Sequence, residues 1–174
     1  LIAKVDGLGN TEPYTYDAAG RRLSVTNANG HTSRVVYDKA GNTVFTIDTT
    51  GAFTRTWHDG AGRGVASRRF ATRLNIATLG DASTVAQLDA QMAFSDQDQG
   101  TFYRVYNAAG QLRYTVDMTS GSTAVLTETL YDGAGRQVLA RAYGAAIAFD
   151  SALAAKLVNG AAVDADFAAF IAAN

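Results

Sequence analysis

The chain has 174 residues, of which 47% are hydrophobic and 18% charged, and its formal net charge is -1. This composition is typical of a folded domain, and the balanced charge provides no global field for attracting nucleic acid or anionic lipid. The chain contains no cysteine, which excludes disulfides, thiolate metal sites and cysteine nucleophiles. Since no run of about 18 apolar residues is present, the sequence predicts no membrane-spanning helix.

A five-residue pattern, here called the Tyr turn, recurs along the chain. In its clearest copies it reads Tyr-Asp-x-x-Gly. The copies lie at residues 16–20, 37–41, 58–62, 106–110 and 131–135. His58 replaces the tyrosine in the third copy, and Asn107 replaces the aspartate in the fourth. Related Asx-x-x-Gly turns at 6–9, 27–30 and 48–51 alternate with the first copies, so turns begin at residues 6, 17, 27, 38, 48 and 59.

The turn chemistry predicts a mainly β fold built of antiparallel hairpins. An Asp or Asn at the first turn position accepts hydrogen bonds from the turn backbone, and Gly three residues later supplies a positive φ. This is a type I turn followed by a left-handed residue, a common hairpin loop. The segments between turns are rich in Thr, Val and aromatic residues, which favour strands. The predicted strands include residues 32–37, 43–47, 53–57, 101–106, 112–116 and 124–131.

An Ala-rich helical insertion is predicted at residues 73–100, where the turn spacing breaks. Val85, Leu88 and Met92 lie three or four residues apart, as on one face of a helix, and Phe94 continues the pattern less regularly. Asp81 or Ser83 is the expected N-cap of this helix.

A second insertion is predicted at 144–174, with helices over 151–157 and 163–171 that are separated by Asn159-Gly160. Both insertions follow a Gly-Ala-Gly-Arg turn, at 60–63 and 133–136, so a larger unit recurs after roughly 73–80 residues. The chain therefore divides into hairpins at 1–72, an insertion at 73–100, hairpins at 101–143 and a second insertion at 144–174. The second copy stops at Asn174, where the first goes on to another strand, so we expect a piece of a longer array.

The Tyr turns resemble the YD-repeat, or RHS-repeat, family. The best copy runs Tyr16-Asp17-Ala18-Ala19-Gly20-Arg21-Arg22-Leu23 and is followed by the Thr26-Asn27-Ala28-Asn29-Gly30 turn. The resemblance implies a long β-sheet that spirals into a hollow shell, as in bacterial polymorphic toxins, toxin-complex subunits and teneurins. It implies a structural segment of a large secreted or surface-displayed bacterial protein that encloses or displays a toxin or other cargo. The expected partners are neighbouring repeats and an enclosed toxin domain.

A carbohydrate-binding or adhesive module is the alternative interpretation. Trp57, Tyr14 and Tyr37 are its candidate glycan contacts, because aromatic faces can stack on sugar rings. In that case Trp57→Ala should weaken saturable glycan binding. The competing interpretation is that each motif tyrosine packs against its counterpart in the next hairpin and forms a hydrogen bond through its hydroxyl.

Other chemistry has little support in the sequence. His31 and His58 are too few for a typical metal site, the Asp96 and Asp98 pair lies in a polar stretch, and no Gly-x-Ser-x-Gly elbow occurs. We therefore expect no enzymatic activity, no cofactor and no metal. A basic cluster at Arg63, Arg68, Arg69 and Arg73 is interpreted as a solvated strand face, not as a nucleic-acid site. Open sheet edges predict self-association of the isolated chain.

Overall fold

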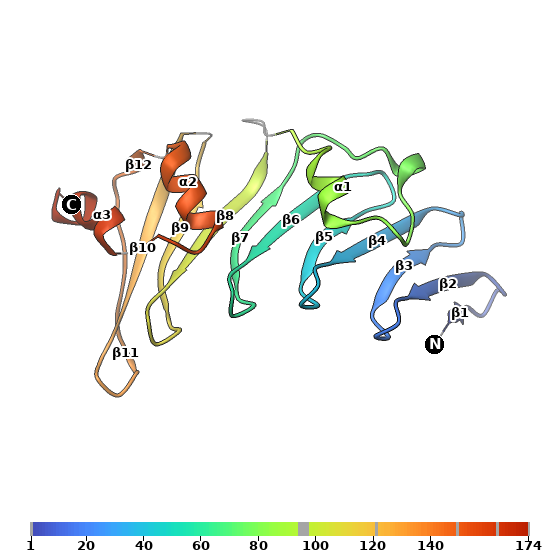
Figure 1. Cartoon of the computed structure of the whole chain (residues 1–174), viewed down its shortest axis with the longest axis horizontal. Coiled ribbons are helices and arrows are strands. Elements are labelled where there is room, and N and C mark those ends of the chain that lie inside the picture. Colours follow the sequence, from blue (N-terminus) through green and yellow to red (C-terminus); the bar gives the residue numbers. More distant parts are fainter. Residues whose placement is uncertain (1, 94–97, 121, 149, 163, 174) are drawn as a thin grey trace. The chain divides into compact units, whose positions relative to one another are not determined.

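The computed structural model describes residues 2–93, 98–120, 122–148, 150–162 and 164–173, and over these residues the protein is mainly β (Figure 1). The strands are β1 (Ala3–Val5), β2 (Thr11–Tyr16), β3 (Arg22–Thr26), β4 (Thr32–Tyr37), β5 (Thr43–Ile47), β6 (Phe53–His58), β7 (Gly64–Arg69), β8 (Gln99–Tyr106), β9 (Leu112–Met118), β10 (Thr123–Tyr131), β11 (Gln137–Ala142) and β12 (Ile147–Ala148). The helices are a 3-10 turn (Ile76–Thr78), α1 (Val85–Asp89), α2 (Ser151–Val158) and α3 (Asp164–Ala173). The predicted array of antiparallel β-hairpins is confirmed.

The chain folds into two compact units. Unit 1 comprises Leu1–Arg55 and Arg69–Ser95, and unit 2 comprises Thr56–Arg68 and Asp96–Asn174. The division between the units passes through β6 and β7. Each unit thus contains hairpins together with one of the two Ala-rich stretches.

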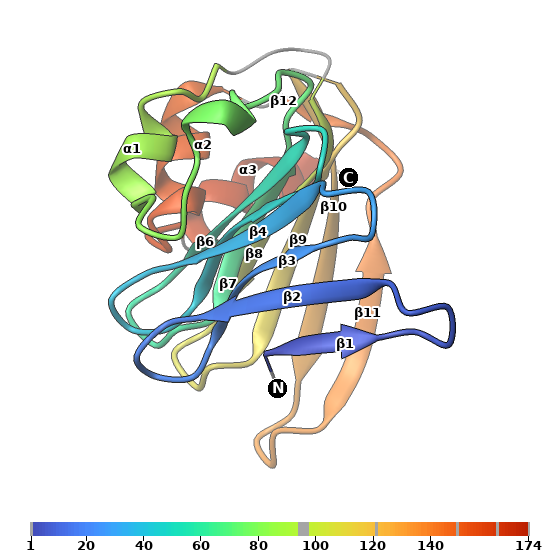
Figure 2. The ribbon, with the colours of Figure 1, turned by 90° about the vertical axis from the view of Figure 1, so that its right-hand side faces the viewer.

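Unit 1 is an antiparallel meander in which β1 to β5 and the first half of β6 pair in chain order (Figure 2). The registers place Ser24 opposite Arg34, Arg34 opposite Ile47, and Ile47 opposite Phe53. Because residues in register share a face of the sheet, these residues form a row across four strands. Ser24, Ile47 and Phe53 are buried, so this is the core face of unit 1.

The segment that follows β7 covers the core face of unit 1. The Phe70 ring stacks on the Phe53 ring, with centroids 4.6 Å apart and planes at 9°. The Phe70 N–H also donates to the Phe53 carbonyl at 3.1 Å. Leu74, Leu79 and Leu88 are buried. The first predicted helix therefore belongs to a core-forming segment that packs on the sheet.

Helix α1 is shorter than predicted and has a different cap. Thr84 is its N-cap: the Thr84 hydroxyl accepts from the Gln87 N–H at 3.3 Å, and Gln87 Oε1 accepts from the Thr84 N–H at 2.9 Å. This reciprocal capping box displaces the two expected caps. Asp81 pairs instead with Arg34 at 2.9 Å, and the Ser83 hydroxyl accepts from a loop N–H. The helix ends at Asp89, before Met92, and Phe94 lies outside the described residues.

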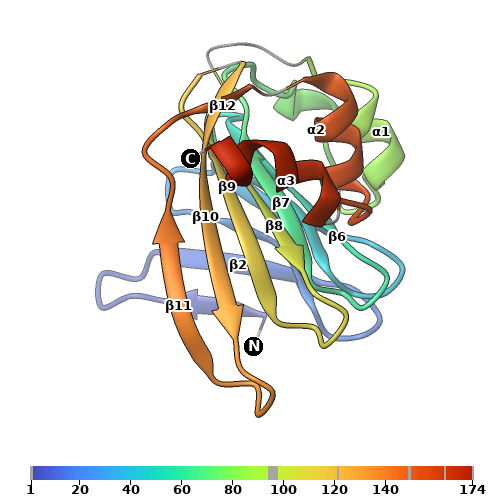
Figure 3. The same cartoon turned by 90° about the vertical axis from the view of Figure 1, so that its left-hand side faces the viewer.

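In unit 2, β8, β9 and β10 pair antiparallel, and β10 pairs on its other side with both β11 and β12 (Figure 3). Helices α2 and α3 lie across one face of this sheet (Figure 3). The predicted helix over 151–157 is confirmed, with Asp150 as its N-cap and Gly160 beyond its end at φ +67°. The second predicted helix is present over 164–173, and Val163 lies outside the described residues.

The core of unit 2 is formed by the sheet and its two helices. Tyr114 and Phe167 are almost fully buried, and their ring centroids lie 4.7 Å apart. Tyr143 meets Phe170 edge-on at 5.5 Å. The second insertion therefore also packs on the sheet instead of projecting from it. Among the described residues, no helix has the length and hydropathy needed to cross a bilayer.

Candidate functional site

Four of the five Tyr turns are closed by the carboxylate of their second residue, and in the fourth copy the Asn107 amide oxygen takes this place by accepting from the Gln111 N–H at 2.9 Å. In the first copy, Asp17 Oδ1 accepts from the backbone N–H groups of Ala19 and Arg21, both at 2.9 Å. Asp17 Oδ2 accepts from Arg21 Nε at 2.7 Å. The Gly20 N–H donates to the Asp17 carbonyl, and Gly20 has φ +77°. The same set of bonds recurs in the turns of Asp59 and Asp132. The predicted turn chemistry is therefore confirmed.

These hydrogen bonds hold the pKa of the turn aspartates below the ordinary value of 3.8. At Asp17 the backbone N–H of Arg21 is the largest cause. At Asp59 desolvation is the largest effect and raises the pKa, but the hydrogen bonds from Arg63 and the turn backbone together outweigh it. The aspartates with a lowered pKa are Asp6, Asp17, Asp38, Asp48, Asp59 and Asp132.

The lowered pKa values predict loss of stability in acid. A group with a lower pKa in the folded state favours folding above its unfolded pKa, and this contribution is lost as the pH falls through the folded pKa. We expect the urea concentration at the midpoint of unfolding to stay constant from about pH 7 to about pH 5 and to fall below about pH 4. Asp132→Asn keeps an oxygen acceptor in the turn, as Asn107 does naturally, and should make the fall smaller. Urea unfolding followed by circular dichroism tests this, and an equally steep fall in Asp132→Asn would contradict it.

The turn tyrosines bind the backbone of the preceding hairpin. The Tyr37 hydroxyl donates to the carbonyl of Arg22 at 3.0 Å, and the Tyr131 hydroxyl donates to the carbonyl of Leu112 at 3.0 Å. Between them, the Tyr106 hydroxyl donates to the carbonyl of Gly64 at 3.3 Å. With the first residue of a Tyr turn counted as position 1, each acceptor is position 7 of the preceding Tyr turn. This repeated contact is here called the Tyr ladder. It confirms that these tyrosines form hydrogen bonds through their hydroxyls, but the bonds are to the backbone of the preceding hairpin and not to the next one.

In three of the five Tyr turns, the residue at position 6 contacts the next Tyr turn along the chain. The Arg21 guanidinium lies 4.6 Å from the ring centroid of Tyr37, and the Arg63 guanidinium lies 4.3 Å from that of Tyr106. Such cation–π contacts at partly exposed sites contribute about 0.5–1 kcal/mol. Where Gln111 replaces arginine, its Nε2 donates to the Gly135 carbonyl at 3.1 Å. Sequence reasoning missed this contact, although the recurrence of Gly-Arg after the turn was visible.

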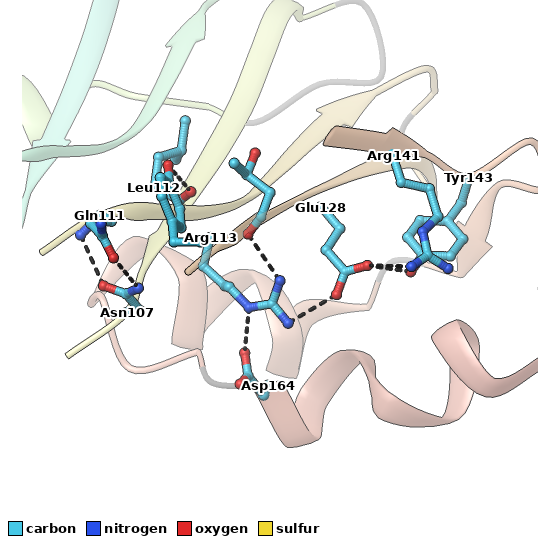
Figure 4. A network of polar contacts seen from close by, with 10 residues as sticks. Asn107, Gln111, Leu112, Arg113, Glu128, Arg141, Tyr143 and Asp164 are labelled. Atoms are coloured by element: carbon cyan, nitrogen blue, oxygen red, sulfur yellow. Dashed lines mark hydrogen bonds and ion pairs between the residues drawn. The ribbon is translucent and has the colours of Figure 1, made fainter. Parts of the chain in front are cut away.

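A buried carboxylate organises a polar network in unit 2 (Figure 4). Glu128 Oε1 accepts from Arg113 Nη2 at 2.9 Å. Glu128 Oε2 accepts from the Tyr143 hydroxyl at 2.7 Å and lies 3.6 Å from Arg141 Nη2. Arg113 Nε also lies 3.5 Å from Asp164 at the start of α3. The network, here called the Glu128 network, links β9, β10 and β11 to the second insertion.

The geometry of the Glu128 network favours anchoring over catalysis. The Glu128 side chain is only 6% exposed, and both of its oxygens are engaged by donors. Burial raises the pKa of Tyr143, and the bond to Glu128 raises it further, so the hydroxyl remains a donor. A buried charge is tolerated when it is paired and fully hydrogen-bonded, as here. Sequence reasoning missed Glu128 and Arg113, because no local pattern marks them.

Unit 1 has a buried charge at the equivalent strand position. Arg55, which precedes Glu128 by the same 73 residues that separate Asp59 from Asp132, is 9% exposed. Its Nε lies 3.0 Å from Asp89 Oδ1 in α1. In each unit, a buried charge on a strand is thus linked by ion pairs to the helical segment that follows: Arg55 directly to Asp89, and Glu128 through Arg113 to Asp164.

The predicted glycan contacts are placed as follows. Tyr37 belongs to the Tyr ladder, and Arg21 covers its ring. Tyr14 is half-buried in unit 1, where the Arg22 guanidinium lies 5.9 Å from its ring centroid. Trp57 is half-buried in unit 2 and packs against the hydrophobic core of that unit. Glycan binding by Trp57, Tyr14 and Tyr37 stays a prediction.

The described residues among the two histidines and the acidic pair are His31, His58 and Asp98. Within the described ranges, no three His, Asp or Glu side chains converge as metal ligands. His31 is exposed, whereas His58 Nδ1 is buried with no hydrogen-bond partner in the part of the chain that the structure describes. Asp96 lies outside the described residues, and Asp98 pairs with Arg68 at 3.4 Å.

The arginines of the predicted basic cluster have separate surroundings. Arg63 pairs with the aspartate of its own turn, and Arg73 donates to the Thr50 carbonyl at 3.2 Å. Arg69 lines an open depression of about 350 Å³ in unit 1, among hydroxyl-bearing strand residues. The carboxylate in that lining, Asp48, is bonded within its own turn.

Comparison with known proteins gives one family match and distant structural likeness. The RHS Repeat family model matches residues 1–32. No curated protein matches the chain. Among solved structures, 82% of the chain is similar to a chain in the crystal structure of TcdB2-TccC3-Cdc42, with 13% sequence identity and a TM-score of 0.43. This chain spans 8% of that longer chain.

Proposed function

We propose that this chain, which belongs to the RHS-repeat family, forms part of the β wall of a large secreted or surface-displayed bacterial protein and helps to enclose or display a cargo segment such as a toxin domain. The role is structural. This role requires that each hairpin be covered by contacts with the next hairpin. It also requires that the wall segment have its own hydrophobic core.

The Tyr ladder is the observation that carries the proposal. Tyr37, Tyr106 and Tyr131 each use a hydroxyl to bind the backbone of the preceding hairpin, at the same position each time. A contact that repeats in this way is expected of an array in which each repeat buries the face of its neighbour. These tyrosines follow the repeat, as contacts between neighbouring repeats do.

The two helical segments support the same role. In unit 1 the segment after β7 buries Phe70 and Leu74 against the sheet, and in unit 2 the second insertion buries Phe167. Each unit therefore has a closed core on one face of its sheet.

The proposal can be tested in the full-length protein by measuring how fast a protease digests the enclosed cargo segment. Phe53→Ala and Leu126→Ala open the cores of units 1 and 2, since both side chains are at most 2% exposed. Removing such side chains costs about 3–5 kcal/mol, so each variant should speed digestion of the enclosed segment by a low dose of protease. Arg104→Gln is the control, because Arg104 is exposed. If the wall segment of a variant is measurably unfolded and its cargo is still digested at the native rate, the wall does not enclose the cargo.

A further inference from the structure

Two Asn-Gly pairs in the chain have the composition required for spontaneous loss of the asparagine amide. Asn29-Gly30 lies in the turn between β3 and β4, and Asn159-Gly160 follows α2. In such a pair the glycine nitrogen attacks the side-chain carbonyl carbon of asparagine, and glycine allows this approach because it has no Cβ. The asparagines that are followed by a residue with a Cβ are Asn10, Asn27, Asn42, Asn75 and Asn107.

The turn around Asn29 is exposed and is closed by hydrogen bonds among its own residues. The Gly30 N–H donates to the Asn27 carbonyl at 2.9 Å, and Asn27 Oδ1 accepts from the N–H groups of Asn29 and His31 at 3.0 Å. A Cβ built on Gly30 would meet nothing within 4 Å. No described residue bonds to the Asn29 side-chain amide. Attack at Asn29 therefore requires only that this turn open.

The second Asn-Gly pair is held more firmly within unit 2. The Gly160 N–H donates to the Leu157 carbonyl at 3.2 Å, where it closes the end of α2. A Cβ built on Gly160 would lie 3.2 Å from the Asp59 side chain and 3.8 Å from that of Val65. Attack at Asn159 therefore requires the end of the helix to move away from these residues. Such an opening is rarer than the opening of an exposed turn, because it also breaks packing contacts.

Three Asp-Gly pairs offer the same backbone freedom but a poorer electrophile. They are Asp6-Gly7, Asp59-Gly60 and Asp132-Gly133. Each of these aspartates has a pKa below its ordinary value and is ionised at neutral pH. A carboxylate ion resists attack because its negative charge is delocalised over both oxygens. The neutral amide of Asn29 has no such protection.

We propose that Asn29 is a modification site at which the chain converts to aspartate and isoaspartate without an enzyme. The Gly30 nitrogen forms a bond to Asn29 Cγ, and the bond from Cγ to the side-chain nitrogen breaks. That nitrogen leaves as ammonia and takes the proton of the Gly30 amide. Water then opens the resulting succinimide ring at either of its two carbonyl carbons. One opening gives aspartate, and the other gives isoaspartate, in which the main chain passes through the former side chain.

The isoaspartate product changes the hairpin that carries it. Its main chain has one additional carbon atom just before Gly30, so the bond from the Gly30 N–H to the Asn27 carbonyl is lost. The β3–β4 pairing nearest the turn joins Thr26 to Thr32. We therefore expect faster hydrogen exchange at this end of the hairpin in the modified chain.

Peptide mapping of the full chain tests the proposal. Trypsin cleaves after Arg22 and Arg34 and releases residues 23–34, which contain both Asn27 and Asn29. After incubation in mildly alkaline buffer, tandem mass spectrometry locates each conversion of an amide to a carboxylate. Methylation of the released peptide by a protein isoaspartyl methyltransferase identifies the isoaspartate product. Asn27 is the internal control, because it lies in the same peptide but precedes an alanine.

In the folded chain we expect conversion at Asn29 to be about tenfold faster than at Asn159, with Asn27 unchanged. In urea both Asn-Gly pairs lose their structure and should convert at similar rates. Gly30→Ala should slow conversion at Asn29 in both conditions, since the added Cβ hinders attack whether or not the chain is folded.

Two results would overturn the proposal. The first is conversion at Asn159 that is as fast as conversion at Asn29 in the folded chain. The second is an intact Asn29 in the folded chain after an incubation that converts it completely in urea. The urea sample shows that the reaction and its detection work, so an intact Asn29 would mean that the folded turn prevents the attack.

Discussion

Replacing Glu128 with alanine should lower the free energy of unfolding of unit 2 by about 3–5 kcal/mol. The variant leaves the 17%-exposed Arg113 guanidinium without its 2.9 Å partner and removes the acceptor of the buried Tyr143 hydroxyl. Breaking a buried ion pair costs more than the pair itself contributes, because desolvation of the guanidinium is then offset only by Asp164 at 3.5 Å and the Thr129 carbonyl at 3.0 Å. Urea unfolding, together with hydrogen exchange of the β9 and β10 amides, measures the loss.

Two further variants distinguish the loss of the buried ion pair from a general destabilisation of unit 2 by any substitution around Arg113. Asp164→Ala removes an exposed contact to the same arginine, at 3.5 Å with Asp164 73% exposed, and should cost at most about 1 kcal/mol. The double variant Glu128→Leu with Arg113→Met removes both buried charges and should be more stable than Glu128→Ala. A Glu128→Ala chain as stable as Asp164→Ala would show that the Glu128 network does not anchor the insertion.

The second large effect is expected at Gly51. This residue has φ +84°, and a Cβ placed on it would lie 2.4 Å from the backbone carbonyl oxygen of Leu74. Backbone cannot move aside as a flexible side chain can. Gly51→Ala should therefore combine left-handed strain with steric overlap and destabilise unit 1 by about 3 kcal/mol or more.

Gly30→Ala is the matched control for Gly51→Ala. Gly30 occupies the same position in an equivalent turn, with φ +79°, and a Cβ there would meet nothing within 4 Å. Only the backbone strain remains, so the expected loss is about 1 kcal/mol. Urea unfolding of both variants gives the difference. Similar losses would mean that the segment around Leu74 moves away from the turn at little cost.

Local chemistry explains why the hairpins could be predicted from the sequence. The strands β4 and β5 have the predicted bounds, and Gly20, Gly30 and Gly41 have the expected positive φ. An Asx side chain and a glycine determine such a turn within five residues, without help from the rest of the fold. The predicted cap of α1, Asp81 or Ser83, was wrong, although Thr84 and Gln87 have the spacing of a capping box in the sequence.

The contacts that join the hairpins could not be predicted in the same way. The Tyr106 hydroxyl and the Gly64 carbonyl are 42 residues apart, and Arg113 and Asp164 are 51 residues apart. Strand register and the packing of the insertions bring these groups together, and neither leaves a local pattern.

The sequence by itself therefore determined the turns, the approximate positions of the predicted strands and the repeat, because these depend on neighbours within a few residues. The tertiary structure alone decided which charges are buried and which tyrosines are bonded. These properties depend on burial and pairing between segments that are distant in the chain. Glu128 and Arg136 show the difference, since one is hidden and the other exposed only by the folding of the sheet.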